Sequence, residues 1–300
     1  MKRVLVTGAS GFIGRHALAP LAARGFEVIA LSRDAGPAVP GVTWRHGDLL
    51  AASEARRLID DVRPSHLLHC AWFAEPGEFW SSPENARWVA ASAALLLAFE
   101  TAGGRRFVGA GTCAEYDWSG GVCSEEATPI HPSTLYGRAK DAVRLLLDGV
   151  TARGQVAGAW GRVFHLYGPH EHPSRFVASV IRSLIAGEPA RCSAGTQVRD
   201  FLHVEDVADA FAALLDSDVT GAVNIASGRG ESIASVARLI AELTGRPGLL
   251  QLGALPVPAG DPDRLVAHVR RLGGEVGWRP KRTLRDGLEQ TVEWWRVVSG

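Results

Sequence analysis

A tyrosine and a lysine stand four residues apart, in Tyr136-Gly137-Arg138-Ala139-Lys140. On a helix this spacing puts both side chains on one face, so the lysine ammonium can approach the phenol. A nearby cation stabilises phenolate and lowers the pKa of a tyrosine toward working pH. Such a tyrosine can exchange a proton with a hydroxyl or carbonyl oxygen, whereas the same pair on an exposed helix face would have no chemical role.

Three glycines follow the first apolar run of the chain at the spacing G-x-x-G-x-x-G. The first would permit a tight turn, the second would let the backbone approach a pyrophosphate, and the third would allow close packing of helix on strand. The helix then offers free N–H groups to an anion. A purely structural turn is the alternative, but the position between a strand and a helix favours a dinucleotide site. The residues expected to contact the dinucleotide are Gly8, Ser10, Gly11, Phe12, Ile13 and Gly14.

The end of the second apolar run bears on the choice of cofactor. NAD sites usually carry an acidic residue there, which holds the ribose 2′-hydroxyl. Here the run ends in Ser32-Arg33, whose side chains could hydrogen-bond and neutralise a 2′-phosphate, and Asp34 follows as the competing ligand. Arg33 could also be a solvated loop residue. We expect NADP to be favoured over NAD.

The composition of the chain argues against several classes of protein. Its 300 residues include 32 basic and 32 acidic ones, and this balance argues against bulk binding to nucleic acid or to an anionic membrane. No apolar stretch approaches the ~20 residues of a membrane span, and the first apolar run is too short for a signal peptide. The four cysteines form no C-x-x-C pair, so we expect neither a metal site nor a disulfide framework from them. We expect a cytoplasmic protein.

The elements that must position these residues alternate along the first half of the chain. Apolar runs typical of strands cover Val4–Thr7, Glu27–Ser32, Val42–Arg45, His66–Cys70, Arg105–Ala110 and part of Val156–Phe164. Helical patterns cover Phe12–Arg24, Ala51–Val62, Pro83–Ala102 and Leu135–Ala152. Continuous apolar strands between helices predict an α/β fold with a doubly wound parallel sheet of Rossmann type, buried on both faces.

The second half of the chain is less regular. The expected helices cover Phe176–Ala186, Val204–Leu215, Ile233–Leu243 and about Leu284–Val297, and the expected strands cover Val198–His203 and Ala222–Ile225, with a loop over Leu252–Pro262. We expect residues 1–164 to form the dinucleotide-binding domain, with about 198–228 returning to it. Residues 165–300 are expected to form mostly a smaller C-terminal α/β substrate-binding domain at the carboxyl edge of the sheet.

Taken together, these motifs resemble the extended short-chain dehydrogenase/reductase family of nucleotide-sugar epimerases, dehydratases and ketoreductases. The resemblance runs nearly end to end. Besides the glycine loop and Tyr136–Lys140, the matching segments are Gly47-Asp48-Leu49, Phe107–Tyr116, Tyr167-Gly168-Pro169, Arg199–Val207, Asn224–Gly228 and Gly277-Trp278-Arg279-Pro280.

The resemblance implies roles for individual residues. Thr112, four residues before Tyr116, corresponds to the Ser or Thr that hydrogen-bonds the reacting oxygen, and completes a catalytic set with Tyr136 and Lys140. Tyr136 and Lys140 are also expected to contact the nicotinamide end of the cofactor. The remaining expected cofactor contacts are Asp48 and Leu49 at the adenine and Cys70-Ala71-Trp72 beside the nicotinamide half.

Three positions bear on how the substrate is bound. Arg199 corresponds to an arginine that binds the substrate diphosphate, a contact that suits a planar guanidinium, and an internal ion pair with Asp200 or Asp206 is the alternative. His165 replaces an asparagine that contacts the nucleotide sugar in the family, and Pro258 replaces an arginine that contacts the diphosphate. A smaller or unusually activated substrate is therefore left open.

The neighbours of Thr112 restrict the reaction. Relatives that dehydrate their substrate follow the threonine with Asp-Glu, and relatives that epimerise at C3 and C5 carry a cysteine two residues after it and a later histidine. The corresponding residues here are Cys113-Ala114 and Phe176, so we expect neither reaction. Cys113 is expected to be a buried apolar residue rather than an acid.

Two loops hold clusters of rings. The segment Ala71–Trp80 contains Trp72, Phe73, Phe79 and Trp80, which could wall a sugar pocket or simply pack together. The run His170-Glu171-His172 lies in a proline-flanked loop, where we expect no metal.

We therefore expect an NAD(P)-dependent nucleotide-sugar oxidoreductase, with reduction of a 4-keto sugar ahead of C4 epimerisation by tightly bound NAD. In the reductive direction Tyr136 would protonate the sugar oxygen. A reductase of a non-sugar carbonyl and a catalytically silent NAD(P)-binding regulator are the further alternatives. By resemblance, we expect a homodimer formed through the helices around Pro83–Ala102 and Leu135–Ala152.

Overall fold

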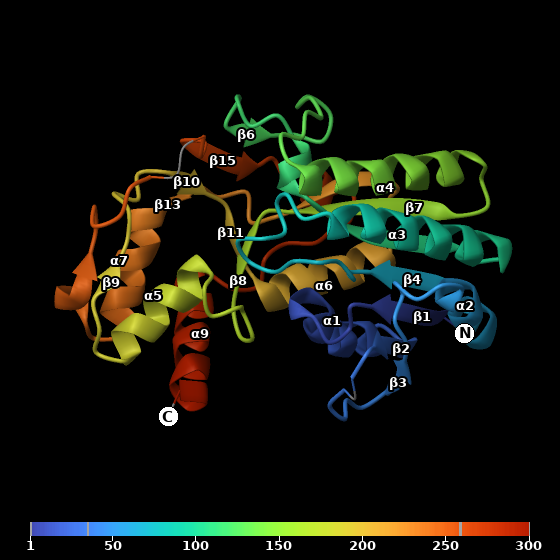
Figure 1. Ribbon diagram of the computed structural model, residues 1–300, viewed down its shortest axis with the longest axis horizontal. Coiled ribbons are helices and arrows are strands. Elements are labelled where there is room, and N and C mark those ends of the chain that lie inside the picture. The colour runs from blue at the N-terminus through green and yellow to red at the C-terminus, as the bar shows by residue number, and fades with distance from the viewer. Residues whose placement is uncertain (1, 35, 258–259, 300) are drawn as a thin grey trace.

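The centre of the molecule is a seven-stranded parallel sheet. The structure, a computed structural model, describes residues 2–34, 36–257 and 260–299. The strand order is β12-β7-β5-β4-β1-β2-β3, and every neighbouring pair runs parallel (Figure 1). The strands span Lys2–Thr7 (β1), Phe26–Ser32 (β2), Val42–His46 (β3), His66–His69 (β4), Arg106–Thr112 (β5), Ala157–Val163 (β7) and Gly221–Ile225 (β12).

Helices cover both faces of this sheet. The helices α1 (Phe12–Ala23) and α6 (Val204–Leu215) lie side by side on one face, and α2 (Glu54–Val62), α3 (Glu84–Thr101) and α4 (Leu135–Ala152) cover the other (Figure 1). Within β1, Val4 and Val6 belong to the core under α1 and α6, whereas Leu5 belongs to the core under α2, α3 and α4. Because alternate side chains are buried on opposite faces, the strands are continuous apolar runs. The predicted doubly wound α/β sheet is confirmed.

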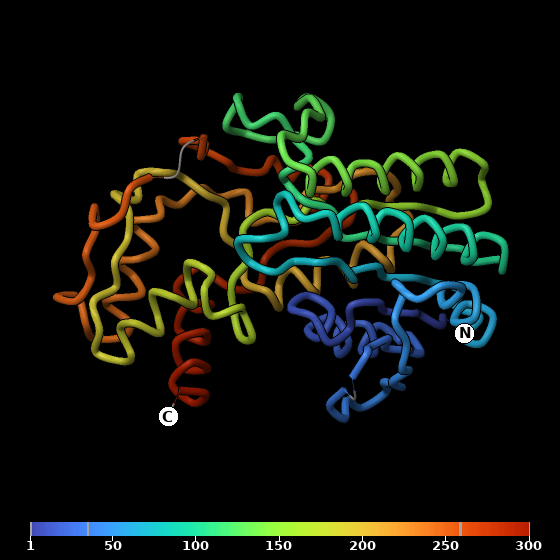
Figure 2. Tube along the Cα trace, in the orientation of Figure 1, coloured from blue at the N-terminus to red at the C-terminus, as the bar shows by residue number. Residues whose placement is uncertain are grey.

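A second apolar core lies beyond the carboxyl ends of the strands. The helices α5 (Phe176–Ile185), α7 (Ile233–Leu243) and α9 (Leu284–Ser299) pack around it, and we call these three helices the C-terminal lobe. Between α5 and α7 the chain returns to the sheet and forms α6 and β12, so it passes more than once between the two parts (Figure 2). No helix within the described ranges is long and apolar enough to cross a membrane.

Short strands join the sheet to the C-terminal lobe. They are β6 (Val122–Cys123), β8 (His165–Tyr167), β9 (Ala190–Arg191), β10 (Val198–Arg199), β11 (Phe201–His203), β13 (Glu231–Ser232), β14 (Leu250–Gln251) and β15 (Arg264–Ala267), followed by the short helix α8 (Arg270–Gly274). Most of them were not predicted, because two to four residues are too few for a periodic pattern.

The expected single strand over Val198–His203 is wrong in one respect, because it is interrupted at Asp200. The Asp200 carboxylate turns inward and accepts hydrogen bonds from the backbone N–H groups of Ser227, Gly228 and Ala267. The strand therefore divides into β10, which pairs with β15, and β11, which pairs with β8.

Candidate active site

The glycine loop joins β1 to α1 at the point where the strand order of the sheet reverses. β1 pairs with β2 on one side and with β4 on the other, and ligands of such sheets bind at this crevice. Gly8 has a φ of +67°, and a Cβ there would lie 2.6 Å from the backbone nitrogen of Ala71. A Cβ at Gly14 would lie 2.1 Å from the carbonyl oxygen of Gly8. Both positions therefore require glycine.

The first turn of α1 is open to an anion. Gly11 precedes the helix without a side-chain cap, and the first turn carries no acidic residue. The free backbone N–H groups and the positive end of the helix dipole both favour negative charge. These residues fit the diphosphate of a dinucleotide, which the segment from Ser10 to Gly14 would hold.

Two further segments border the expected adenosine end of that site. Asp48 accepts a hydrogen bond from the backbone N–H of Leu50 at 3.0 Å. Ser32 donates its hydroxyl proton to Ser10 Oγ at 3.1 Å and accepts from the backbone N–H of Asp34. Arg33 and Asp34 are both exposed at the carboxyl end of β2. The cation and the carboxylate that compete for the ribose contact thus lie at the same edge of the sheet.

The three expected catalytic residues meet at the carboxyl end of β5. This strand runs on to Thr112 rather than ending at Ala110, as was expected. Tyr136 and Lys140 lie one turn apart in α4, where Lys140 Nζ is 5.9 Å from the centre of the Tyr136 ring. The Thr112 hydroxyl is close enough to the Tyr136 phenol to act on its pKa. The structure therefore brings together a hydroxyl, a phenol and an amine that lie 28 residues or less apart in the sequence.

Lys140 is almost completely buried, and this environment changes the pKa of its ammonium group. Its Nζ donates to the carbonyl oxygen of Ala110 at 2.8 Å and lies 4.0 Å from the centre of the Trp72 ring. Burial lowers the pKa of Lys140 to about 7, although the negative charge of Glu115 opposes this.

The expectation that Lys140 lowers the pKa of Tyr136 is wrong for this structure. Burial raises the pKa of Tyr136, and the nearby Thr112 hydroxyl opposes that rise. Burial penalises the charged form of both residues, and the ammonium is directed to the Ala110 carbonyl and the Trp72 ring.

A buried ion pair that the sequence analysis missed supports Thr112. Glu115 accepts a hydrogen bond from the backbone N–H of Thr112 at 2.9 Å, and its carboxylate pairs with Arg162 on β7 at 2.7 Å. The exposed fractions of the two side chains are 0% and 2%, so water does not screen the pair. Arg162 also donates to the Tyr116 oxygen at 2.9 Å, and Tyr116 donates to Asn224 on β12. The network ties the residues after β5 to β7 and β12.

Aromatic side chains surround Tyr136. The rings of Phe79 and Trp80 meet it edge-on, with 4.9 and 5.8 Å between ring centres. Trp72 stacks on Trp88 at 6.3 Å on the side of Lys140. The rings of the 71–80 loop therefore lie around the tyrosine and the lysine.

Two of the expected substrate residues lie on the short strands β8 and β10, outside the parallel sheet. His165 lies on β8 with its Nδ1 atom buried, and that atom has no hydrogen-bond partner among the described residues. Burial lowers the pKa of His165 to about 3, and the positive charges of Arg199 and Arg175 add to this effect. A neutral imidazole with an unused nitrogen is thus held beside two arginines.

Arg199 is engaged in an internal ion pair, but not with the expected partners. Its guanidinium lies 2.5 Å from Asp261 Oδ1. Asp200 instead binds backbone N–H groups, and Asp206 pairs with Arg282, so the alternative pairing with either residue is wrong. Pro258, where the family carries a further arginine, lies outside the described residues.

The structure also bears on the expectations for Cys113 and for the loop His170-Glu171-His172. Cys113 is buried, and burial raises the pKa of its thiol, as expected for an apolar role rather than an acid. In the proline-flanked loop, the His170 ring packs on Trp294 with 4.7 Å between ring centres. The side chain of Glu171 is buried, whereas that of His172 is exposed. Across the described ranges, no group of three His, Cys, Asp or Glu side chains could hold a metal ion.

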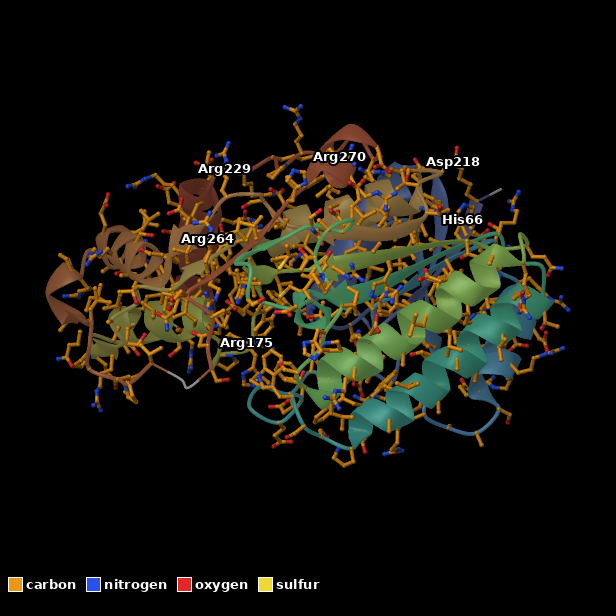
Figure 3. All side chains as sticks on the ribbon, turned by 90° about the horizontal axis from the view of Figure 1, so that it is seen from above. His66, Arg175, Asp218, Arg229, Arg264 and Arg270 are labelled. Atoms are coloured by element: carbon orange, nitrogen blue, oxygen red, sulfur yellow. The ribbon has the colours of Figure 1, made fainter. Side chains whose placement is uncertain are left out.

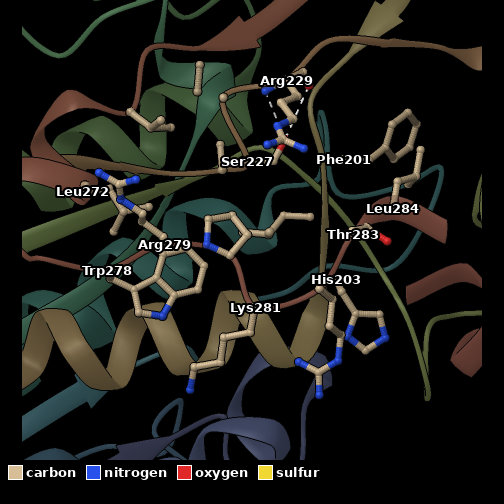
Figure 4. Close-up of a pocket in the computed structure, with 18 of the residues that line it drawn as sticks. Phe201, His203, Ser227, Arg229, Leu272, Trp278, Arg279, Lys281, Thr283 and Leu284 are labelled. Carbon is tan, nitrogen blue, oxygen red and sulfur yellow. Dashed lines mark hydrogen bonds between the residues drawn. The ribbon is translucent and has the colours of Figure 1, made fainter. Parts of the chain in front are cut away.

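A cavity of about 780 Å³ lies apart from these residues, between α6, α8 and the segment that leads into α9 (Figure 4). Its walls include His203, Ser227, Arg229, Trp278 and Arg279. Thr112, Tyr136 and Lys140 do not line it. The size of this cavity therefore does not mark the candidate active site, which is defined by the catalytic set.

A doubly wound sheet with a glycine loop and a buried hydroxyl–Tyr–Lys set defines a dinucleotide-dependent enzyme of the extended short-chain dehydrogenase type. Comparison with known proteins supports this class. A family model described as "NAD dependent epimerase/dehydratase family" matches residues 4–226. The chain belongs to this family.

Several relatives match over nearly the whole chain. A UDP-glucose 4-epimerase from Rhizobium leguminosarum bv. trifolii is 28% identical, and the match covers 97% of this chain and 96% of the relative. UDP-glucuronic acid decarboxylase 1 from Xenopus tropicalis is 27% identical, with 98% of this chain and 72% of the relative covered. The solved structure of MoeE5 in complex with UDP-glucuronic acid and NAD is 33% identical, covers 99% of both chains and has a TM-score of 0.85.

Proposed function

We propose that this enzyme is a nucleotide-sugar 4-epimerase that recycles a tightly bound NAD. The observation that carries the proposal is the meeting of Thr112 with Tyr136 beside Lys140, followed by Cys113 and Ala114, which offer no carboxylate for a second acid or base. Such a set serves one carbon and its oxygen. The similarity to UDP-glucose 4-epimerases favours epimerisation over net reduction, which reverses the order expected from the sequence.

The residues of the set have separate tasks in this proposal. Thr112 holds the O4 hydroxyl of the sugar, and Tyr136 takes its proton and later returns it. Lys140 would bind the nicotinamide ribose. NAD, when bound at the glycine loop, would supply a reversible acceptor for the C4 hydride. Because the hydride returns to the opposite face of the C4 ketone and the proton returns to O4, the configuration at C4 is inverted, and the sugar leaves as an isomer without consuming cofactor.

Net reduction of a 4-keto sugar is the second candidate, favoured by one observation. Ser32 and Arg33 stand where NAD sites usually carry an acidic residue, and Arg33 is exposed there for contact with a 2′-phosphate. The preference for NADP stays a prediction, and the solved relative MoeE5 carries NAD.

The proposed substrate contacts come from the two expected substrate residues on β8 and β10. His165 would contact the nucleotide sugar through its unused nitrogen, and Arg199 would bind the diphosphate. We also propose a homodimer formed through α3 and α4, because Leu97, Leu145 and Leu146 expose large apolar side chains on these helices. Light scattering of the purified protein measures that state.

The experiment that tests the function needs no added cofactor. Purified protein is incubated with UDP-glucose or UDP-glucuronic acid, and the products are separated. The dinucleotide released on denaturation is identified by mass spectrometry. We expect C4 epimers to form in large excess over enzyme, with NAD released. Turnover that stops without added NADPH, and that consumes it in equal amount, would instead establish the reductase.

A further inference from the structure

Arg175 brings a positive charge next to the candidate catalytic tyrosine. It is the residue that precedes α5, between the C-terminal lobe and the helices of the sheet (Figure 3). Its guanidinium carbon lies 5.2 Å from the centre of the Phe79 ring, and the Phe79 ring meets Tyr136 edge-on at 4.9 Å. The guanidinium and the phenol therefore both lie next to the Phe79 ring, and the positive charge of Arg175 is close enough to oppose the rise in the pKa of Tyr136.

This guanidinium is half-buried, and no carboxylate in the described ranges forms an ion pair with it. The other two arginines of the site do have such partners, since Arg162 pairs with Glu115 and Arg199 pairs with Asp261. The buried Glu171 is close enough to be affected by the charge of Arg175, but burial raises the pKa of Glu171 to about 8. Glu171 is thus largely neutral at pH 7 and does not balance the arginine.

A half-buried guanidinium that has no ion-pair partner within the part of the chain that the structure describes is free to bind an anionic group of a ligand. The Arg175 guanidinium carbon lies within cation–π distance of the Phe79 ring, and its N–H groups donate to no side chain or carbonyl of the described residues, so they can bind a planar, bidentate partner. A carboxylate has that shape. The environment of Arg175 therefore fits a carboxylate group of the substrate.

The position of the tyrosine selects which part of the substrate this is. Tyr136 serves O4 of the sugar in the proposed function, and C6 is attached to C5, the neighbour of C4. The diphosphate is attached at C1, across the sugar ring, and the proposed function assigns it to Arg199 rather than to Arg175. We infer that Arg175 forms a subsite for a C6 carboxylate, so that the enzyme acts on a nucleotide-linked uronic acid in preference to the neutral hexose. This inference rests on the proposed function for the placement of O4.

The test compares UDP-glucuronic acid, UDP-glucose and UDP as ligands of the whole protein by calorimetry, together with kcat/KM for both sugars. Wild type should favour the uronate. Arg175→Gln should weaken the uronate by ~10-fold to ~100-fold, the value of a charge-assisted pair, and should change UDP-glucose and UDP little. Arg175→Lys keeps the charge and should retain part of the preference.

The matched control is Arg229→Gln, which removes an exposed arginine at the separate cavity and should leave the preference intact. Wild type without a preference for the uronate would overturn the inference. An equal loss for the uronate, for UDP-glucose and for UDP in Arg175→Gln would also overturn it, because Arg175 would then bind the diphosphate. Because binding is measured apart from turnover, a protein that prefers the uronate but forms no C4 epimer would contradict the proposed reaction and leave the subsite standing.

Discussion

The two sides of the candidate site differ in how far their polar groups are satisfied. On the side of the sheet, Glu115 and Arg162 hold each other in full burial, and Lys140 has a carbonyl partner. On the opposite side, formed by the short strands and the start of α5, Arg199 pairs with Asp261, but His165 keeps an unpartnered nitrogen within the described ranges and Arg175 makes no ion pair there. Buried polar groups are normally paired, so the first side is complete in itself and the second side is arranged to be completed by a ligand.

This difference separates two properties of the enzyme. Changes on the side of the sheet should affect turnover and stability, because they break a network that holds Thr112 and α4 in place. Changes on the opposite side should affect the choice of substrate and leave the fold intact. The predictions below test this division, beginning with the largest expected effect.

The first prediction concerns Tyr136→Phe. Removing the phenol oxygen removes the group that exchanges the O4 proton, so kcat should fall by ~10²-fold to ~10⁴-fold. The dinucleotide released on denaturation should be unchanged in amount, since the glycine loop is intact. Wild-type turnover in this variant would remove Tyr136 from the chemistry.

The second prediction concerns Glu115→Ala. It leaves the Arg162 guanidinium buried without its partner, and the free energy of unfolding should fall by about 3–5 kcal/mol in chemical denaturation. The matched control is Glu84→Ala, which breaks a more exposed pair with Arg87 on α3 and should cost less than about 1 kcal/mol. Similar losses in the two variants would mean that the buried network is not a special support.

The third prediction concerns the pH dependence contributed by Lys140. The unfolded chain binds this proton below its ordinary pKa of 10.5, whereas the folded protein binds it only below about 7. The unfolded state therefore binds more protons between these values, and the contribution of Lys140 makes the free energy of unfolding rise with pH across the window.

Lys140→Met isolates this contribution. In protein stripped of dinucleotide, the stability of Lys140→Met minus that of wild type should shrink as pH rises from 7 to 8.5, by up to about 1.4 kcal/mol per pH unit. The measurement is chemical denaturation at several pH values. A constant difference over that range would contradict the lowered pKa of Lys140.

The smallest expected effect belongs to Arg33→Ala. If the guanidinium contacts a 2′-phosphate, its loss should weaken NADP by ~10-fold and leave NAD unchanged, as measured by titration of the stripped protein. Asp34→Ala is the reciprocal variant and should weaken NAD instead if the carboxylate holds the ribose. If the affinity for NADP and the affinity for NAD are each the same in Arg33→Ala as in wild type, Arg33 is a solvated loop residue.

The sheet was predictable from the sequence, because strands buried on both faces form continuous apolar runs whatever surrounds them. The glycine loop and the Tyr136–Lys140 pair were also predictable, since each depends on spacing within one short segment. The pairing of Glu115 with Arg162 was not, because the two residues lie 47 positions apart and meet only when β5 and β7 pair. One signal was present: Arg162 interrupts an otherwise apolar strand.

Arg175 shows a second kind of limit. Its neighbours along the chain give no sign of a role, and its meaning comes from Phe79 and Tyr136, which different loops and helices bring beside it. The error about the pKa of Tyr136 has a related cause. Spacing along a helix predicts that two groups are close, but the depth at which they are buried depends on the whole fold.

The central claim is that one carbon of a nucleotide sugar loses a hydride and receives the same hydride back. UDP-glucose and UDP-glucuronic acid, each carrying deuterium at C4, would be incubated with the protein and no added cofactor, and the products followed by NMR and mass spectrometry. We predict C4 epimers that retain the deuterium at C4. Loss of the label to free dinucleotide, or the absence of any epimer of either sugar, would contradict the account.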